Sequence, residues 1–331
     1  MQYILSIYNR SIRGPLEVLF LMLIKGGGEI VRAVLIVEDE KIIEHKELQK
    51  DEDVVIGKKK KELSPKQLKI ANEKQAIKRH CSQLGGFVHM LCVRNELLFN
   101  SLNIDRADIS RLIYLATYID YNNRKENLLI VRKKGQKNTP MTRENMQELL
   151  KLADKQFKAF LKNMKNNNLI WKVGEKYYIS NVYFTKGKTG FDTKEYTRLF
   201  VDTTRYLYEH VATRQHKILG YVFQLVPYCH YELNVICKNP LEVDPARIEK
   251  LSLMEICKML GISTDKGNMV KFRNSLSNFV VKVKGTRYYL FAHNTVRAGE
   301  IRDYFIINPL IVWAGSDENK TRDIIETLYF S

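Results

Sequence analysis

Histidine and cysteine, the side chains that most often bind metals or carry out catalysis, do not gather into a recognisable site in this sequence. The seven histidines include no His-x-His pair, and the five cysteines include no Cys-x-x-Cys pair. No cluster of carboxylates accompanies the histidines. Because metal and catalytic sites need several such groups at suitable spacing, the sequence predicts no metal, no cofactor and no enzymatic activity.

Two further segments resemble reactive motifs but lack essential residues. Gly187-Lys188-Thr189 resembles the end of a phosphate-binding loop, which requires a glycine five residues before Gly187, where this chain has Val182. Residues 34–40 resemble the first strand and acidic pair of response-regulator receivers, but the later apolar strands lead into lysine runs. We therefore expect neither nucleotide binding nor a phosphoacceptor.

The charge balance points instead to a polyanionic partner. The chain has 54 lysine and arginine residues against 37 aspartate and glutamate residues, a formal net charge of +17, and its pI is near 9.5. Each phosphate that a cation neutralises releases condensed counterions, so this excess favours nucleic acid. The alternative is a basic surface that serves only solubility.

The cysteines and the most apolar run of the chain bear on its compartment. Widely spaced cysteines in apolar surroundings are typical of free thiols in a reducing compartment. The apolar run at residues 16–24 is far shorter than the roughly 20 residues that span a bilayer. It also contains Glu17 and leads into no cleavage site. We expect a buried strand or helix here, and a cytoplasmic protein without membrane contact.

The residues best suited to bind nucleic acid lie on two polar helices. From residue 155 to about 166, Phe157, Phe160, Leu161 and Met164 recur at helical spacing and predict a buried face. On the other face, lysines can address phosphates and guanine, and glutamine and asparagine can address adenine. The expected contacts are Lys155, Gln156, Lys158, Lys162, Asn163 and Lys165.

A second polar helix, which runs to about residue 277, repeats this arrangement. Met269, Phe272, Leu276 and Phe279 predict its apolar side. The expected contacts on its other side are Lys266, Asn268, Lys271, Arg273 and Asn274.

Each polar helix is the second member of a predicted helix-turn-helix. In the first copy, Thr142 is expected to cap the first helix and Asp154 the second. In the second copy, Ser252 and Glu255 form a capping box at the start of the first helix. The plan is thus repeated within one chain.

The elements before each helix pair repeat as well, at a spacing of roughly 106 residues. An apolar helix and a short strand are predicted at 112–121 and 128–131 in the first copy. Their counterparts in the second copy lie at 218–228 and 234–237. The order of helix, strand and two helices is typical of a winged helix.

A hairpin, the wing, is predicted after each helix pair. Its strands lie at 169–173 and 177–182 in the first copy, and at 279–283 and 288–291 in the second. A tyrosine pair follows each turn. The cations expected to contact DNA from these wings, and from the segment before the first helix pair, are Lys172, Lys176, Lys284, Arg287, Arg132, Lys133 and Lys134.

The sequence therefore predicts an α+β fold, mainly helical, with two tandem winged-helix domains after a small β-rich N-terminal segment. The alternative is two unrelated α+β stretches that align by chance. The expected boundaries are 1–57 for the β-rich segment, 58–84 for a basic linker helix, 85–190 and 200–315 for the winged helices, and 316–331 for a C-terminal helix.

The first copy resembles the winged-helix replication proteins of Gram-positive plasmids and phages. The resemblance rests on Asn-Asn-Asn-Leu-Ile at 166–170, the tyrosine-rich hairpin, and Asn-Val-Tyr-Phe-Thr-Lys-Gly at 181–187. Ile-Asn-Pro-Leu-Ile-Val-Trp-Ala-Gly at 307–315 is a second match. The resemblance covers about 85–190 and, more loosely, 200–315, where an insertion precedes the Asn-Pro step.

This resemblance implies a replication initiator that binds repeated or palindromic origin DNA through both modules, together with the replication machinery. A transcription regulator on the same scaffold, working with the transcription machinery, is the first alternative. The second is an adaptor whose winged helices bind protein. The C-terminal helix at 321–330 either packs on its own module, which we favour, or mediates a homodimer.

Overall fold

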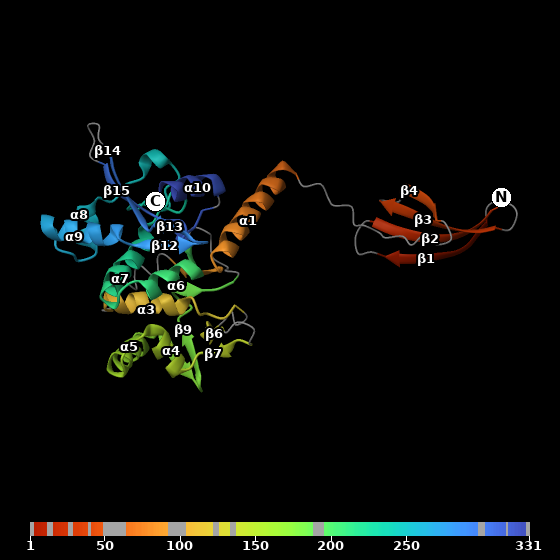
Figure 1. Ribbon diagram of the computed structural model, residues 1–331. Helices are drawn as coiled ribbons and strands as arrows, with labels where there is room; N and C mark the ends of the chain where they lie inside the picture. Colours follow the sequence, from red (N-terminus) through yellow and green to blue (C-terminus); the bar gives the residue numbers. More distant parts are fainter. Residues whose placement is uncertain are drawn as a thin grey trace. The chain divides into compact units, whose positions relative to one another are not determined.

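The computed structural model describes residues 3–11, 16–25, 29–38 and 41–48 as strands, and describes residues 64–91, 104–121, 126–132, 137–187, 195–296, 302–315 and 317–328. The described chain has an α+β fold with several small antiparallel hairpins (Figure 1). It divides into two compact units, Met1–Leu63 and Ser64–Ser331.

The first unit contains a four-stranded antiparallel sheet. Its strands β1 (Tyr3–Ser11), β2 (Leu16–Lys25), β3 (Glu29–Glu38) and β4 (Lys41–Leu48) pair in chain order. The apolar run that begins at Leu16 is therefore a strand. Among the described residues, no helix has the length and apolar character needed to cross a membrane.

A second antiparallel sheet, in the order β10-β5-β11-β16, lies at the centre of the Ser64–Ser331 unit. It consists of β5 (Phe87–Leu91), β10 (Phe184–Thr185), β11 (Tyr196–Phe200) and β16 (Val312–Trp313). β5 and β11 pair along their whole length, and each carries one short strand on its outer edge. The sheet is thus nearly symmetric about the β5–β11 pair.

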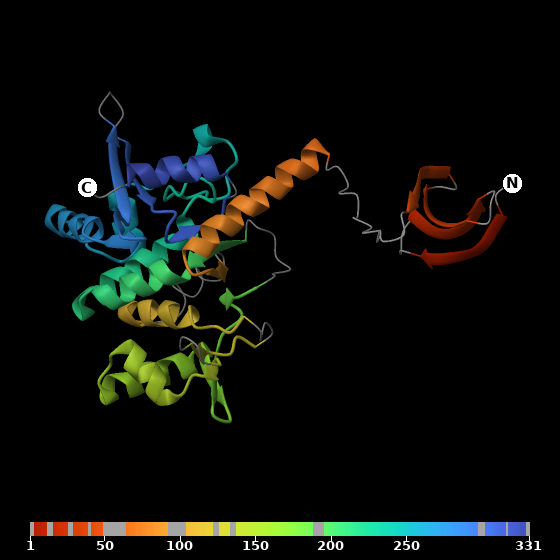
Figure 2. The ribbon, with the colours of Figure 1, turned by 45° about the vertical axis from the view of Figure 1, so that its right-hand side comes forward.

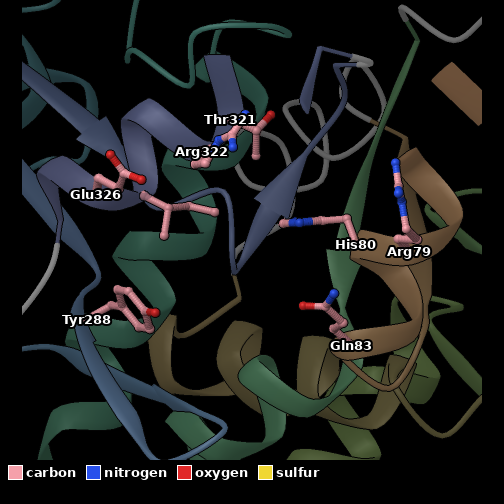
Figure 3. Close-up of a pocket in the computed structure, with 8 residues that line it drawn as sticks. Arg79, His80, Gln83, Tyr288, Thr321, Arg322 and Glu326 are labelled. Atoms are coloured by element: carbon pink, nitrogen blue, oxygen red, sulfur yellow. The ribbon is translucent and has the colours of Figure 1, made fainter. Parts of the chain in front are cut away.

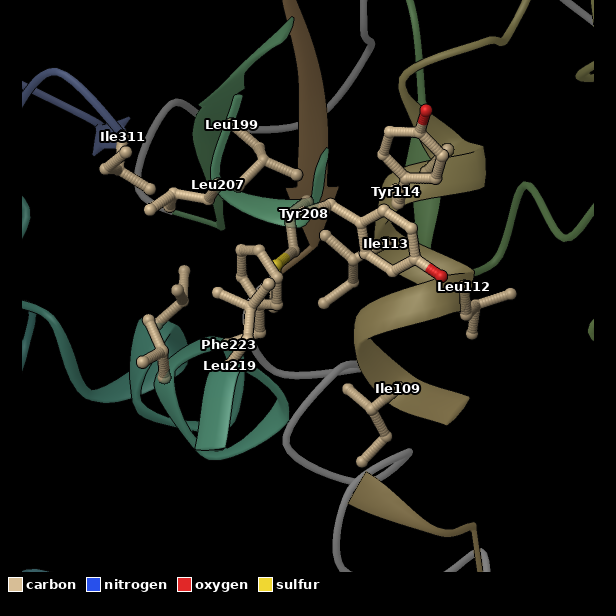
Figure 4. Close-up of a cluster of buried hydrophobic side chains, with 14 of the residues drawn as sticks. Ile109, Leu112, Ile113, Tyr114, Leu199, Leu207, Tyr208, Leu219, Phe223 and Ile311 are labelled. Atoms are coloured by element: carbon tan, nitrogen blue, oxygen red, sulfur yellow. The ribbon is translucent and has the colours of Figure 1, made fainter. Parts of the chain in front are cut away.

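Three helices pack together beside this sheet: α3 (Arg106–Ala116), α6 (Val201–His210) and α7 (His216–Leu225). Figure 4 shows their apolar side chains meeting those of β11. The contact between α3 and α7 depends on Gly220, because a Cβ atom there would lie 1.8 Å from the carbonyl oxygen of Arg106. Only glycine allows so close an approach.

The two halves of this unit share one hydrophobic core. Buried side chains from residues 81 to 313 form a single continuous cluster. At the junction of the halves, the ring of Tyr208 stacks between Tyr114 and His216, with ring centroids 4.1 Å and 4.3 Å away. The Tyr208 hydroxyl also donates to the carbonyl of Leu150, 3.2 Å away.

In the first half, α3 is followed by a short strand, two helices and a hairpin. The helices are α4 (Arg143–Leu150) and α5 (Asp154–Asn166). The hairpin consists of β8 (Ile170–Val173) and β9 (Lys176–Ile179), and the strand segment includes β6 (Ile130–Val131), which pairs with β7 (Thr139–Pro140).

The strand segment of the first half runs beside β9. The backbone N–H of Leu129 donates to the carbonyl of Tyr177 at 2.9 Å, and that of Ile179 donates to the carbonyl of Asn127 at 3.2 Å. The segment before α4 joins the same strand, because Met141 N–H donates to the carbonyl of Leu129 at 2.9 Å.

The second half repeats this order but contains two hairpins. Its helices are α8 (Leu253–Met259) and α9 (Lys266–Ser277). The hairpins are β12 (Val280–Val283) with β13 (Thr286–Tyr289), and β14 (Phe291–Val296) with β15 (Arg302–Ile307). Three short 3-10 helices complete the second half: Thr213–Gln215, Val226–Tyr228 and Pro245–Arg247.

Hydrogen bonds show which hairpin corresponds to β8–β9. In the second half, Ile236 N–H donates to the carbonyl of Phe305 on β15 at 2.9 Å, as Leu129 does to Tyr177. Ile307 N–H donates to the carbonyl of Asn234 at 3.0 Å. The counterpart of β8–β9 is therefore β14–β15, and β12–β13 is an additional hairpin.

The sequence predicts a hairpin after α9, and β12–β13 confirms it, but its predicted equivalence with β8–β9 is wrong. The tyrosine pair at Tyr288 suggests equivalence with the pair at Tyr177. In the structure, however, the residue of the second half that occupies the position of Tyr177 is Phe305. Local sequence predicts that a hairpin forms, whereas the strand it joins depends on contacts made far away in the chain.

Two helices flank the repeated halves, α1 (Pro65–Gln83) and α10 (Glu318–Thr327). α10 packs on its own unit, since Thr321 and Leu328 are buried and the carbonyl of Leu328 accepts a hydrogen bond from Tyr289 N–H at 2.7 Å. Figure 2 shows α1 projecting from the unit at its N-terminal end.

Candidate nucleic-acid interface

The first helix pair begins with a capping box. The Thr142 hydroxyl accepts a hydrogen bond from Asn145 N–H, and the Asn145 side chain accepts one from Thr142 N–H, both at 3.2 Å. α4 ends at Leu150, and the left-handed backbone of its C-cap, Lys151 (φ 52°), turns the chain. Thr142 is thus the cap that the sequence predicts.

The cap of α5 differs from the prediction. The N-cap is Ala153, and Asp154 lies in the first turn of the helix. The Asp154 carboxylate instead pairs with Lys158 at 2.7 Å and with Arg143 of α4 at 2.9 Å. These hydrogen bonds, that of Lys158 foremost, hold the pKa of Asp154 below its usual value.

α5 buries one face and exposes lysines on another. Phe157, Phe160, Leu161 and Met164 are buried, which confirms the predicted apolar side. The exposed lysines follow the spacing i, i+3, i+7 and i+10, which places them on one side of the helix. They are Lys155, Lys158, Lys162 and Lys165.

Two amide side chains of α5, Gln156 and Asn163, lie on a different side from the lysines. Gln156 and Asn163 line a cavity of about 320 Å³ with Asp108 and Arg111 of α3. Asn163 is half-buried, and its side-chain oxygen accepts a hydrogen bond from Asn167 at 2.9 Å. The lysine stripe is therefore the outward face of α5, and Asn163 supports the packing of α5 against α3.

Of the two lysines of the hairpin β8–β9, one is neutralised by a neighbouring carboxylate. Lys172 is held by Glu175 at 3.0 Å and lies 5.8 Å from the ring centroid of Tyr177. Lys176 is exposed and forms no ion pair with any described residue. At the tip, Val173 is 60% exposed beside Gly174, whose positive φ of 56° forms the turn.

The second helix pair is capped in the predicted way. Ser252 accepts a hydrogen bond from Glu255 N–H at 3.3 Å, and Glu255 accepts one from Ser252 N–H at 3.0 Å. Lys238 also pairs with Glu255 at 2.8 Å. The hydrogen bond from Lys238 and those from Ser252 lower the pKa of Glu255 to about 2.

α9 presents a mixed polar face. Phe272, Leu276 and Phe279 are buried, as predicted, and Met269 is half-buried. Arg273 is half-buried and donates to the Asn274 side chain at 3.4 Å. The exposed residues among those predicted to bind DNA are Lys266, Asn268, Lys271 and Asn274.

The remaining residues predicted to contact DNA lie on different parts of the chain. Arg132 is exposed, whereas Lys133 and Lys134 lie outside the described residues. Lys284 and Arg287 are exposed but belong to the additional hairpin β12–β13, which packs against α6. These two cations are therefore not on the hairpin that corresponds to β8–β9.

Both exposed helices lie on one side of the unit. Figures 1 and 2 each show α5 and α9 on the side away from α1, with α3 and α7 between them. The structure thus places α5 and α9, which are about a hundred residues apart in sequence, on the same side of the unit, separated by α3 and α7.

Arg143 is a residue of this surface that sequence reasoning missed. It joins α4 to α5 through Asp154, and its guanidinium carbon lies 5.2 Å from the ring centroid of Phe157. These contacts are tertiary, so no local pattern indicates them. Arg143 thus links the two helices and partly neutralises Asp154.

Five of the described histidines form hydrogen bonds within the fold. The ring nitrogens of His80, His89, His210, His216 and His230 hydrogen-bond with backbone carbonyls. Within the part of the chain that the structure describes, no group of three or more histidine, cysteine or acidic side chains is arranged to hold a metal ion.

Comparison of the chain with protein-family models, with curated proteins and with solved structures finds no match in any of the three. The geometry of the two helix pairs is therefore the main guide to function.

Proposed function

We propose that this chain is a duplex DNA-binding protein of the replication-initiator type, built from two tandem winged helices. Each half contains a helix, a strand, two helices and a hairpin whose second strand is hydrogen-bonded to the strand, and the second half has the additional hairpin β12–β13. In a winged helix of this order, the second helix of the pair enters the major groove. These helices are α5 and α9.

The observation that carries the proposal is the lysine stripe of α5. Four exposed lysines share one side of a helix whose opposite side is buried, and among the described residues only Lys158 of the four pairs with a carboxylate. A row of cations along an exposed second helix suits the phosphates that border a groove, and lysine also reads guanine. Gln156 remains available for a contact at the edge of this surface.

The approximate symmetry of the unit suggests the form of the DNA site. β5 and β11 pair antiparallel, β10 and β16 lie outside them, and α3 packs against α7. The two halves are thus related by an approximate two-fold axis. Helices related in this way meet one duplex in opposite directions, so we expect two inverted half-sites that differ in sequence because α5 and α9 differ.

The described cysteines support a cytoplasmic location. Cys81, Cys229, Cys237 and Cys257 are free, which suits the reducing environment of a cytoplasm. Cys92 lies outside the described residues. A cytoplasmic location is also where plasmid or phage DNA would be met.

Binding to duplex DNA over a range of salt concentrations tests the proposal. With about six phosphate contacts, the affinity should fall roughly a thousandfold between about 50 and 200 mM salt. Weak, salt-insensitive binding would reject it. Footprinting on the native genome then separates an initiator, which protects repeated sites at an origin, from a transcription regulator, which protects promoters.

A further inference from the structure

The N-terminal half of α1 is largely uncovered. Residues 65–75 are exposed, apart from the half-buried Glu73. The helix is anchored near its C-terminal end, where Ala76, Cys81 and the following Leu84 are buried. Its N-terminal half therefore stands away from the unit, as Figures 1 and 2 show.

The inner side of α1 faces α10 across a groove that carries both signs of charge. One part, about 770 Å³, is lined by Lys69 and Glu73 of α1 and by Glu232 and Asp317 opposite. The other part, about 660 Å³, lies at the base of α1 (Figure 3). There Arg79, His80 and Gln83 come from α1, and Thr321, Arg322 and Glu326 come from α10.

The outer side of α1 is different, because it carries cations and no carboxylate. Its exposed residues, which do not line the groove, are Lys66, Gln67, Ile70, Ala71, Lys74, Gln75 and Lys78. None of the three lysines forms an ion pair with a described residue. From Lys66 to Lys78 the ridge is about 18 Å long, at the usual rise per residue of an α-helix.

We propose that this outer ridge of α1 binds the phosphate backbone of a second DNA duplex, separate from the one that α5 and α9 hold. Lysine and glutamine side chains that form no ion pair with a described carboxylate suit contacts to phosphate, which carry no sequence information. This inference rests on the proposed function, because that function makes DNA the partner.

The position of α1 is the reason for a second duplex. α1 projects on the side of the unit opposite α5 and α9 in both views. A straight duplex on α5 and α9 therefore does not reach the ridge, and DNA is stiff over tens of base pairs. One protein molecule would then hold two duplexes at once.

Capture of one duplex by another tests this inference. The full-length protein is bound to a bead-immobilised duplex that carries its footprinted site, and a labelled duplex of unrelated sequence is added. The wild type should retain the labelled duplex in a salt-sensitive manner. The variant Lys66→Gln/Lys74→Gln/Lys78→Gln should retain about tenfold less, because three phosphate contacts are lost.

A matched variant separates charge from folding. Lys66→Arg/Lys74→Arg/Lys78→Arg keeps the cations on the same exposed ridge and should retain the labelled duplex as the wild type does. Both variants should bind the immobilised duplex normally. A wild type that binds the first duplex and captures no second one would overturn the inference, as would a glutamine variant that captures it fully.

Failure of the proposed function gives a different result. In that case, substitution of Lys155 and Lys162 on α5 would leave binding of the first duplex unchanged. Duplex binding that persists in this α5 variant and disappears in the α1 glutamine variant would support the ridge and reject α5 as the reader.

Discussion

Asn127 and Asn234 occupy equivalent positions in the two halves of the Ser64–Ser331 unit. Each has a left-handed backbone, with φ of 50° and 52°, and each is buried. The side-chain amide of Asn127 donates to the carbonyl of Phe184 on β10 at 2.7 Å, and that of Asn234 donates to the carbonyl of Val312 on β16 at 2.8 Å. Each asparagine thus ties its half to the central sheet.

Replacement of either asparagine by alanine should destabilise the protein. Alanine leaves a buried carbonyl without its donor and is disfavoured at positive φ, so the free energy of unfolding should fall by about 2–3 kcal/mol. Glycine adopts positive φ readily, so the glycine variants should lose less stability than the alanine variants at both positions. Denaturant titration of the four variants checks this, and alanine variants as stable as the wild type would refute the shared role.

Gly220→Ala should strongly destabilise the protein, although it adds only one methyl group. The added Cβ would lie 1.8 Å from the Arg106 carbonyl oxygen, so α3 and α7 would have to separate. We expect the free energy of unfolding to fall by about 3 kcal/mol or more, which is at the upper end of the range for substitutions that overpack a core.

Gly267→Ala is the matched control for this substitution. Gly267 lies within α9, and a Cβ atom there meets nothing within 4 Å. Alanine should leave stability unchanged or raise it by up to about 1 kcal/mol, because it favours the helix. Equal effects of the two substitutions on thermal unfolding would contradict the close packing of α3 on α7.

The sequence predicts the repeated helix pairs because their signals are local. The Thr142 and Ser252 caps and the apolar face that contains Phe157 depend on neighbouring residues, and the structure confirms them. The hairpin of the second half that corresponds to β8–β9 could not be predicted, because the correspondence depends on the distant hydrogen bond between Ile236 and Phe305. The inward role of Asn163 depends in the same way on packing between α3 and α5.

The lysines of α5 should not contribute equally to DNA binding. Lys155→Ala/Lys162→Ala should weaken duplex binding and reduce the slope of log affinity against log salt by about 1.8, because two phosphate contacts are removed. Lys158→Ala should have a smaller effect, since Lys158 is already paired with Asp154 at 2.7 Å.

Asp154→Asn tests the same surface in the opposite direction, because it removes a negative charge instead of a positive one. It removes the carboxylate that neutralises Lys158 and Arg143, so affinity for duplex DNA should rise a few-fold at low salt. Fluorescence anisotropy measures all three variants. The ranking would be refuted if Lys158→Ala weakened binding more than the double substitution did.

Stability should decrease as the pH falls below about 6.5. Burial, together with the charge of Arg198, lowers the pKa of His89 to about 4, and burial also lowers the pKa values of His216 and His230. The unfolded chain takes up these protons near pH 6.5, whereas the folded protein does so only at lower pH. The contribution of neutral His89 is complete above pH 6.5 and is lost as the pH falls toward 4.

For His89 alone, the lowered pKa corresponds to a loss of roughly 3 kcal/mol in the free energy of unfolding as the pH falls from above 6.5 to below 4. His89→Gln removes the titrating group, so its free energy of unfolding should vary less between pH 7.5 and pH 5 than that of the wild type. Chemical denaturation at both pH values makes the comparison. A pH dependence unchanged by the substitution would exclude His89 as its source.

Footprinting of matched α5 and α9 variants tests the central claim that both halves hold one duplex. On a native DNA site, Lys155→Ala/Lys162→Ala should remove protection from one half-site, and Lys271→Ala/Asn274→Ala should remove it from the other. The account is contradicted if both variants expose the same bases, if neither alters the footprint, or if the wild type protects no duplex.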